Sequence, residues 1–246
     1  MQRALWTAAA GMSVQQMNLD VISNNLANVN TTGFKKSRAE FEDLLYQTIN
    51  APGTASSSST NLPAGIQVGL GAKTASVKRM FSQGDFKPTE NPLDLVIEGD
   101  GFFKVTRPDG TIVYTRDGSL QTNENGNLVN NQGYLLDPPV VIPTDAKGVT
   151  IARDGTVTAR LADDTISQIG TIELAHFINP AGLQSLGNNN FVPSQASGDP
   201  VLGTPGKDGL GEIGQGFLET SNVQIVNELV DMITAQRAYE LNSRPS

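Results

Sequence analysis

The spacing of apolar residues in the first thirty positions most constrains what this chain can fold into. They recur at intervals of three and four, interrupted at Gln15, and comprise Leu5, Ala8, Met12, Leu19, Ile22, Leu26 and Val29. This period is typical of a long helix with one apolar stripe, which must be covered by another helix or by a neighbouring molecule. Residues 28–32 have weak helix propensity and Gly33 tolerates a left-handed turn, so we expect the helix to end there.

The end of the chain carries a matching pattern. Asn222 is a candidate helix cap, and the apolar residues after it again recur at intervals of three and four: Val223, Val226, Leu229, Val230 and Ile233, widened by Ile225 and Met232. The simplest intramolecular arrangement places the two amphipathic helices side by side. We therefore expect the first and last segments to form one discontinuous domain, with the middle of the chain looped out between them.

The middle of the chain changes character twice. The pattern of Phe41, Leu44 and Leu45 continues helical and acidic up to residue 49, and residues 50–63 are then rich in serine, glycine and proline. Such a composition, taken alone, is typical of a flexible linker. From Val68 to about Leu218 short runs alternate with period two and are separated by turn signals such as Asp-Gly, which predicts antiparallel hairpins. A loop-rich tail is expected over residues 187–216.

Together these patterns predict an α+β fold. We expect the terminal helices to form a coiled-coil-like domain around a central antiparallel β-rich domain that carries an extended insertion. The expected boundaries are 1–45 for the N-terminal helical domain, 46–75 for the extended insertion, 76–218 for the β-rich domain and 219–246 for the C-terminal helix.

Composition argues against several functional classes. The net charge of -8 disfavours duplex nucleic acid as a partner, and the absence of cysteine excludes thiol chemistry and disulfides. A single histidine, His176, has no second imidazole with which to bind a metal. Acidic residues are therefore the remaining candidates for a site, namely Asp94, Glu98, Asp100, Asp163 and Asp164, and most acids of this kind lie on solvated strands or turns. We expect no catalytic residue, no cofactor and no metal.

Several motifs resemble one known family. Residues 23–35 read SNNLANVNTTGFK, which resembles the N-terminal signature of the bacterial flagellar rod and hook proteins. The stretch from Glu219 to Glu240 is similar to the closing motif of the same proteins, and residues 99–103 and 114–118 resemble further landmarks. The length and the stretch 62–71 point to the distal-rod branch of this family, because hook proteins are usually much longer. Relatives usually continue past the closing motif, whereas this sequence ends at Ser246, so we expect a weaker C-terminal half of the helical pair.

The resemblance implies a non-enzymatic structural subunit of the flagellar basal-body distal rod. Such a subunit polymerises into a rigid helical tube that transmits torque from the motor to the hook across the periplasm. The implied partners are further copies of the chain, the proximal rod proteins and hook protein at the ends of the tube, the rings around it and the type III export apparatus. No nucleic acid or small-molecule substrate is expected. We also expect no cleaved signal peptide, because the apolar stripe runs through residues 4–12 and cleavage would remove its first repeat.

Two sets of residues are candidate sites under this interpretation. The expected assembly interface consists of Leu5, Met12, Leu19, Ile22, Leu26, Val29, Val226, Leu229 and Ile233. The expected rod-specific insertion, which would pack against neighbouring subunits, includes Ala51, Pro52, Gly53, Leu62, Pro63 and Gly65. The alternative function is a secreted β-rich surface adhesin or polysaccharide-acting enzyme that uses the acidic strands as its site.

Overall fold

The computed structural model describes residues 2–50, 55–57, 60–61 and 66–243, and the chain divides into two compact units. The helical unit comprises Met1–Ala27, Ser37–Arg79 and Gln224–Ser246. The β-rich unit comprises Asn28–Lys36 and Met80–Val223. The fold is thus α+β, with a helix near each end of the chain and a β-rich region between them. Neither helix, over its described residues, is long and apolar enough to cross a membrane.

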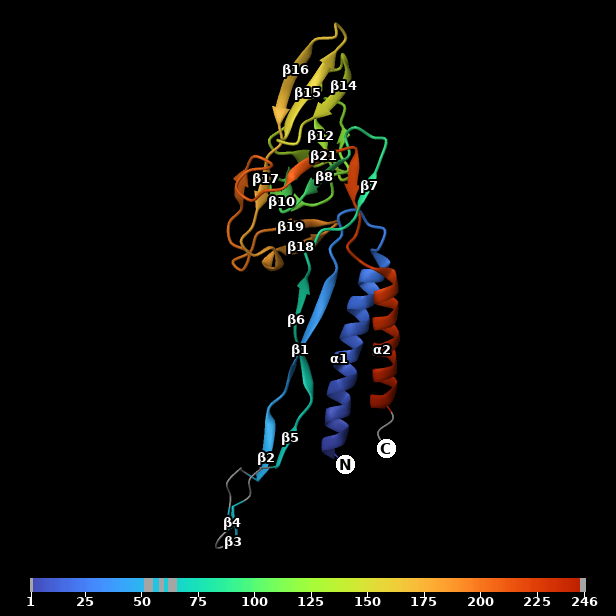
Figure 1. The fold of residues 1–246 in the computed structure, drawn as a ribbon, viewed down its shortest axis with the longest axis vertical. Helices are drawn as coiled ribbons and strands as arrows, with labels where there is room; N and C mark the ends of the chain where they lie inside the picture. Colours follow the sequence, from blue (N-terminus) through green and yellow to red (C-terminus); the bar gives the residue numbers. More distant parts are fainter. Residues whose placement is uncertain (1, 51–54, 58–59, 62–65, 244–246) are drawn as a thin grey trace. The chain divides into compact units, whose positions relative to one another are not determined.

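The helical unit contains two helices, α1 (Gln2–Ala27) and α2 (Ile225–Ser243). They lie side by side and run in opposite directions (Figure 1), since Asn25 of α1 meets Glu228 of α2 while Gly11 of α1 meets Asn242. α1 ends just before the asparagine- and threonine-rich stretch, where the loss of helix propensity predicts an end.

The rest of the helical unit is a β-ribbon of successive antiparallel pairs. The pairs are β1 (Ser37–Asp43) with β6 (Ala72–Arg79), β2 (Tyr46–Asn50) with β5 (Ile66–Gly69), and β3 (Ala55–Ser57) with β4 (Thr60–Asn61). The helical pattern expected up to residue 49 is therefore wrong. Pairing with strands that follow much later in the chain supplies the backbone hydrogen bonds that a helix would otherwise provide, and three apolar residues were too few to distinguish the two structures.

The β-ribbon lies along α1, which contacts both β1 and β6. Between β5 and β6, Gly71 has a φ of +115°, and a Cβ built there would be 3.0 Å from the Cβ of Ala10. A glycine at this position lets the ribbon approach the small side chains of α1 closely.

The β-rich unit is organised around a 9-stranded antiparallel sheet. Its main path runs β11 (Gln121–Thr122), β12 (Leu128–Val129), β13 (Leu135–Leu136), β9 (Phe102–Thr106), β10 (Ile112–Thr115), β19 (Asn190–Val192) and β18 (Gln184–Gly187). Off this path, β17 (Leu174–His176) pairs with β9 and with β20 (Val201–Gly203), and a short 3-10 helix, η1 (Pro180–Gly182), follows β17.

Smaller sheets complete the β-rich unit. A 3-stranded sheet consists of β14 (Ala146–Ile151), β15 (Thr156–Leu161) and β16 (Ile166–Thr171) (Figure 1). Two further pairs join distant parts of the sequence: β8 (Leu95–Glu98) with β21 (Glu212–Gln215), and β7 (Phe86–Pro88) with β22 (Phe217–Glu219). The tail expected to be loop-rich therefore contains β19, β20 and β21, because these short strands pair with partners remote in sequence.

Two apolar clusters form the core of the β-rich unit. The larger includes Phe103, Val113 and Ile213, and the smaller is aromatic, with Tyr114 packed edge-on against Phe177 at 4.9 Å between ring centroids. Burying one such side chain contributes about 1.5 to 3 kcal/mol relative to leaving it exposed. The β-rich unit thus has a hydrophobic core of its own.

Candidate assembly surface and buried ion cluster

The contact between α1 and α2 is made of small and polar side chains. On α2 the inward positions recur every seven residues, with Glu228 and Ala235 buried and Asn242 half-buried. On α1 a Cβ built at Gly11 would lie 2.9 Å from the Nδ2 atom of Asn242. The lack of a side chain at Gly11 therefore lets the two helices approach closely, and a seven-residue repeat keeps one face of α2 on α1.

Asn25 fixes the position of three elements in the helical unit. Its side chain is 2% exposed, donates to Glu228 Oε2 at 3.2 Å and to the Ser37 carbonyl at 2.8 Å, and accepts from the Ser37 N–H at 2.8 Å. α1, α2 and the start of β1 thus share one buried amide. Sliding any of them would leave a buried polar group unpaired, so Asn25 specifies their register.

Six large apolar residues of α2 are exposed and do not pack on α1. They form a surface, here called the α2 apolar face, that consists of Ile225, Val226, Leu229, Val230, Ile233 and Leu241. Val226 is 72% exposed and Ile233 is 57% exposed. The two helices lie side by side in one discontinuous unit as expected, but their close approach at Gly11 and Asn242 uses a different face of α2 from this one.

On α1 the expected interface residues are distributed unevenly. Ile22 is buried, together with Val14, a residue that the sequence pattern did not include. Leu5 is exposed, and Met12, Leu19, Leu26 and Val29 are half-buried. The nine expected interface residues are thus not gathered in one buried layer. The six expected insertion residues, Ala51, Pro52, Gly53, Leu62, Pro63 and Gly65, lie outside the described residues.

A buried ion cluster lies in the β-rich unit. Lys35 comes from the segment that follows α1, Arg116 is the residue directly after β10, and Glu219 is the last residue of β22. Lys35 Nζ is 2.5 Å from Glu219 Oε1, and Arg116 Nε is 3.2 Å from Glu219 Oε2. Their side chains are 0%, 4% and 1% exposed, respectively. One carboxylate therefore balances two cations away from water.

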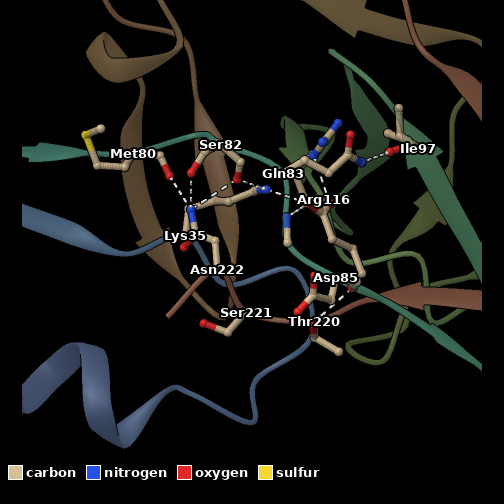
Figure 2. Close-up of polar contacts among 12 residues, drawn as sticks. Lys35, Met80, Ser82, Gln83, Asp85, Ile97, Arg116, Thr220, Ser221 and Asn222 are labelled. Atoms are coloured by element: carbon tan, nitrogen blue, oxygen red, sulfur yellow. Dashed lines mark hydrogen bonds and ion pairs between the residues drawn. The ribbon is translucent and has the colours of Figure 1, made fainter. Parts of the chain in front are cut away.

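The surroundings of the cluster hold each charge in place (Figure 2). Lys35 Nζ also donates to the Ser82 carbonyl at 2.8 Å, and the Gly84 N–H donates to Glu219 Oε1 at 2.9 Å. Arg116 Nη1 donates to the carbonyls of residues 99 and 101 at 2.9 and 2.7 Å. Buried charges are tolerated only when paired and hydrogen-bonded in this way.

Burial acts on both cations of the cluster. It lowers the pKa of Lys35, while the Glu219 carboxylate opposes the shift and the Arg116 charge adds to it. Burial also lowers the pKa of Arg116, again opposed by Glu219 and by Asp100. The Glu219 carboxylate therefore stabilises the charged forms of both Lys35 and Arg116.

One further residue, Gly33, explains part of the motif near the cluster. Gly33 has a φ of +67°, and a Cβ there would lie 2.9 Å from the Arg116 carbonyl carbon, so that only glycine fits without strain. Its N–H donates to the Glu219 carbonyl at 2.8 Å. The family-like motifs around residues 33–35, 99–101, 116 and 219 are thus brought together in space. The sequence analysis identified each motif but did not predict that they lie close together in the fold. The charged residue in each motif was the signal that could have indicated this proximity.

Asn222 has a different role from the expected helix cap. Its Nδ2 donates to the carbonyls of Met80 and Ser82 at 2.9 and 3.0 Å, and its Oδ1 accepts from the Lys36 N–H at 2.7 Å (Figure 2). α2 begins only at Ile225. The capping prediction is wrong because backbone groups from two distant segments occupy this side chain.

The acidic and histidine candidates are not arranged as a catalytic or metal site. Asp94 is buried and accepts from Asn91, while Asp163 accepts from the N–H and hydroxyl of Thr165 within one turn. His176 lines a cavity of about 20 Å³ with Asp100, Arg116 and other residues, which is room for about one water molecule. Within the described part of the chain no three His, Cys, Asp or Glu residues are grouped to hold a metal ion.

The fold and these sites define a class of protein built for contact rather than for chemistry: two terminal helices with an uncovered apolar face and a self-contained β-rich unit. Three family profiles match the sequence. They are described as flagella basal body rod protein (residues 5–35), flagellar hook protein FlgE/F/G D1 domain (96–159) and flagellar basal body rod FlgEFG protein C-terminal (215–244).

Individual relatives agree over nearly the whole chain. The flagellar basal-body rod protein FlgG of Borreliella burgdorferi is 51% identical, with 99% of this chain and 93% of the relative covered. The proteins of the same name from Caulobacter vibrioides and Bacillus subtilis are 48% and 39% identical, covering 98% and 99% of this chain and 93% and 94% of theirs. The chain belongs to the bacterial flagellar rod and hook protein family. It is a structural, non-enzymatic component of the flagellar basal-body rod, as the sequence motifs predict.

Proposed function

We propose that this chain polymerises into the distal part of the flagellar rod, as a rigid helical tube that transmits torque from motor to hook across the periplasm. The observation that carries the proposal is the α2 apolar face, which the helical unit leaves uncovered. A tube of many copies needs heterologous contacts, in which the donor and acceptor surfaces differ. The names of the relatives, which are basal-body rod proteins, support the same role.

The α2 apolar face is suited to contact with helices of neighbouring copies. Val226, Val230 and Ile233 follow one another along a single side of α2 and are exposed in the isolated chain. A contiguous apolar surface of this kind marks an interaction site, and covering each side chain contributes about 1.5 to 3 kcal/mol. In the proposed assembly, helices of adjacent copies pack in a coiled-coil-like layer, to which α1 contributes Leu5, Met12, Leu19 and Leu26, and the turn after α1 contributes Val29.

The β-ribbon supplies a second contact in this proposal. Exposed apolar side chains lie on both halves of the β-ribbon, namely Leu45, Tyr46 and Ile49 on the first half and Val68 and Leu70 on the second. We assign residues 46–75 to an extended insertion that packs between neighbouring copies and resists sliding. The proposed partners at the two ends of the tube are proximal rod proteins and the hook protein. The surrounding rings and the type III export apparatus are further proposed partners.

Substitution on the α2 apolar face tests the proposal. Val226→Asp places a charge on this face, whereas Asn227→Asp adds the same charge one residue further along, at an exposed position off the face. Burying an unpaired carboxylate at an interface costs far more than the lost contact. We expect Val226→Asp to be absent from basal bodies purified from cells and imaged by electron microscopy, and Asn227→Asp to be present. Equal incorporation of both variants, each folded by circular dichroism, would overturn the proposed surface.

A further inference from the structure

We infer that Glu219 couples the docking of two terminal segments on the β-rich unit, so that they become ordered together or not at all. The N-terminal segment is residues 28–36, which follow α1 in the chain. The C-terminal segment is residues 217–223, which precede α2. Both belong to the β-rich unit, although they are separated by most of the sequence.

The two segments bind each other directly at three points. The Lys35 ammonium contacts the Glu219 carboxylate, the Gly33 N–H donates to the Glu219 carbonyl at 2.8 Å, and the Lys36 N–H donates to Asn222 Oδ1 at 2.7 Å. Each contact has one partner in each segment. Removing either segment therefore removes all three interactions from the other.

Both segments also bind one short connection, residues 80–85. Lys35 Nζ and Asn222 Nδ2 share the Ser82 carbonyl, while the Gly84 N–H reaches Glu219 and the Thr220 N–H donates to the Asp85 carbonyl at 2.8 Å. Figure 2 shows Asn222 directed at Met80 and Ser82, and Lys35 directed at Ser82. When one segment docks, it therefore fixes the backbone of residues 80–85 in the position where the other segment binds.

The charges make this coupling strong. With the C-terminal segment undocked, Lys35 would be buried beside Arg116 without the carboxylate that balances both. Two like charges in a site closed to water repel each other strongly, so the N-terminal segment cannot keep its position. With Lys35 removed instead, Glu219 still has Arg116 as a partner. The loss of Glu219 should consequently disturb the N-terminal segment more than the loss of Lys35 disturbs the C-terminal segment.

The chain order gives this coupling a consequence for the helices. α1 leads directly into the N-terminal segment, and α2 begins two residues after the C-terminal segment. Coupled docking therefore orders the attachment points of both helices in one step. In a chain in which Glu219 has not docked, the attachment points of both helices would remain unordered.

Hydrogen exchange of the full-length protein tests the inference. In Glu219→Gln we expect amide exchange to accelerate by about tenfold or more in both segments, as expected for loss of a charged, buried interaction. Peptides from β9 and β10 should keep their protection. Glu212→Gln is the matched control, because it removes an exposed carboxylate, paired with Arg153 at 3.2 Å, from the same unit. Faster exchange confined to residues 217–223, with 28–36 unchanged, would overturn the coupling.

A second variant keeps the test decisive if Glu219→Gln unfolds the β-rich unit as a whole. Lys35→Met removes one cation and leaves the Glu219–Arg116 pair in place. We expect faster exchange in residues 28–36 and a smaller but measurable acceleration in residues 217–223. Protection of residues 217–223 that is identical to the unsubstituted protein would show that the segments dock independently.

Discussion

In the β-rich unit, Phe103 and Ile213 are closed off from solvent on all sides, whereas in the helical unit a residue of the same kind, Ile233, faces outward. Among the described residues, every large side chain that is fully buried belongs to the β-rich unit. The helical unit buries Val14 and Ile22 but joins its helices largely through small and polar groups. One region thus stabilises itself, and the other keeps its apolar surface for neighbours.

The largest test of this comparison uses one truncation in each unit. Phe103→Ala opens a cavity in a closed core and should lower the free energy of unfolding by about 3 to 5 kcal/mol. Ile233→Ala removes a side chain that already faces solvent, so the same measurement on monomer should change by no more than about 0.5 kcal/mol. Denaturant titration of dilute monomer gives both values. Equal destabilisation by the two substitutions would contradict the comparison.

A smaller effect is expected where the helical unit does hold itself together. Asn25→Ala removes three hydrogen bonds and leaves Glu228 without that partner, which should cost about 1 to 3 kcal/mol. The loss should be local, seen as faster amide exchange in α1 and α2 with unchanged exchange in β9. Ser23→Ala, at an exposed position two residues earlier, is the control. Unchanged exchange in Asn25→Ala would mean that this amide does not set the register.

The smallest expected effect concerns the pH dependence of stability. One carboxylate in each unit should contribute to it, with opposite signs. Burial raises the pKa of Asp117 in the β-rich unit above its ordinary 3.8, with Asp94 adding to the shift and Ser119 opposing it. Its contribution to stability is therefore fully present below that ordinary pKa and is lost as pH rises through the folded-state pKa. On the β-ribbon, hydrogen bonds from Lys78 and Arg38 lower the pKa of the half-buried Glu40 below 4.5. That contribution is present above 4.5 and is lost as pH falls through the folded-state pKa.

Two variants separate these contributions. Relative to Asp117→Asn, the unsubstituted protein should gain stability as pH is lowered from neutral towards 3. Relative to Glu40→Gln it should lose stability over the lower part of the same range. Thermal unfolding at a series of pH values measures both stability differences. If the two differences change with pH in the same direction, the opposite pKa shifts of Asp117 and Glu40 are contradicted.

Sequence reasoning succeeded where the signal was local. The period of three and four predicted both helices, and period two with Asp-Gly turns predicted the β-rich region, since these patterns follow from backbone geometry alone. The strands at residues 37–50 were missed because their partners lie at residues 66–79, and Phe41, Leu44 and Leu45 fit either structure.

The candidate sites show a different kind of limit. A stripe such as Val226 to Ile233 identifies apolar residues but cannot tell whether α1 or a neighbouring molecule covers them. The ion cluster joins Lys35, Arg116 and Glu219, whose sequence separations carry no periodic signal. Its three charged residues lay in recognised motifs, but only the folded backbone places them within contact of one another.

The turn between β15 and β16 offers a practical advantage. Asp163 and Thr165 satisfy each other's polar groups at 2.6 and 3.0 Å, and Asp164 between them already has a left-handed φ of 62°. The turn is exposed and lies far in sequence from the α2 apolar face and from the segments joined by Glu219. It is therefore a suitable place for a genetically encoded epitope or fluorophore-binding peptide, through which copies of the chain could be counted and located in living cells.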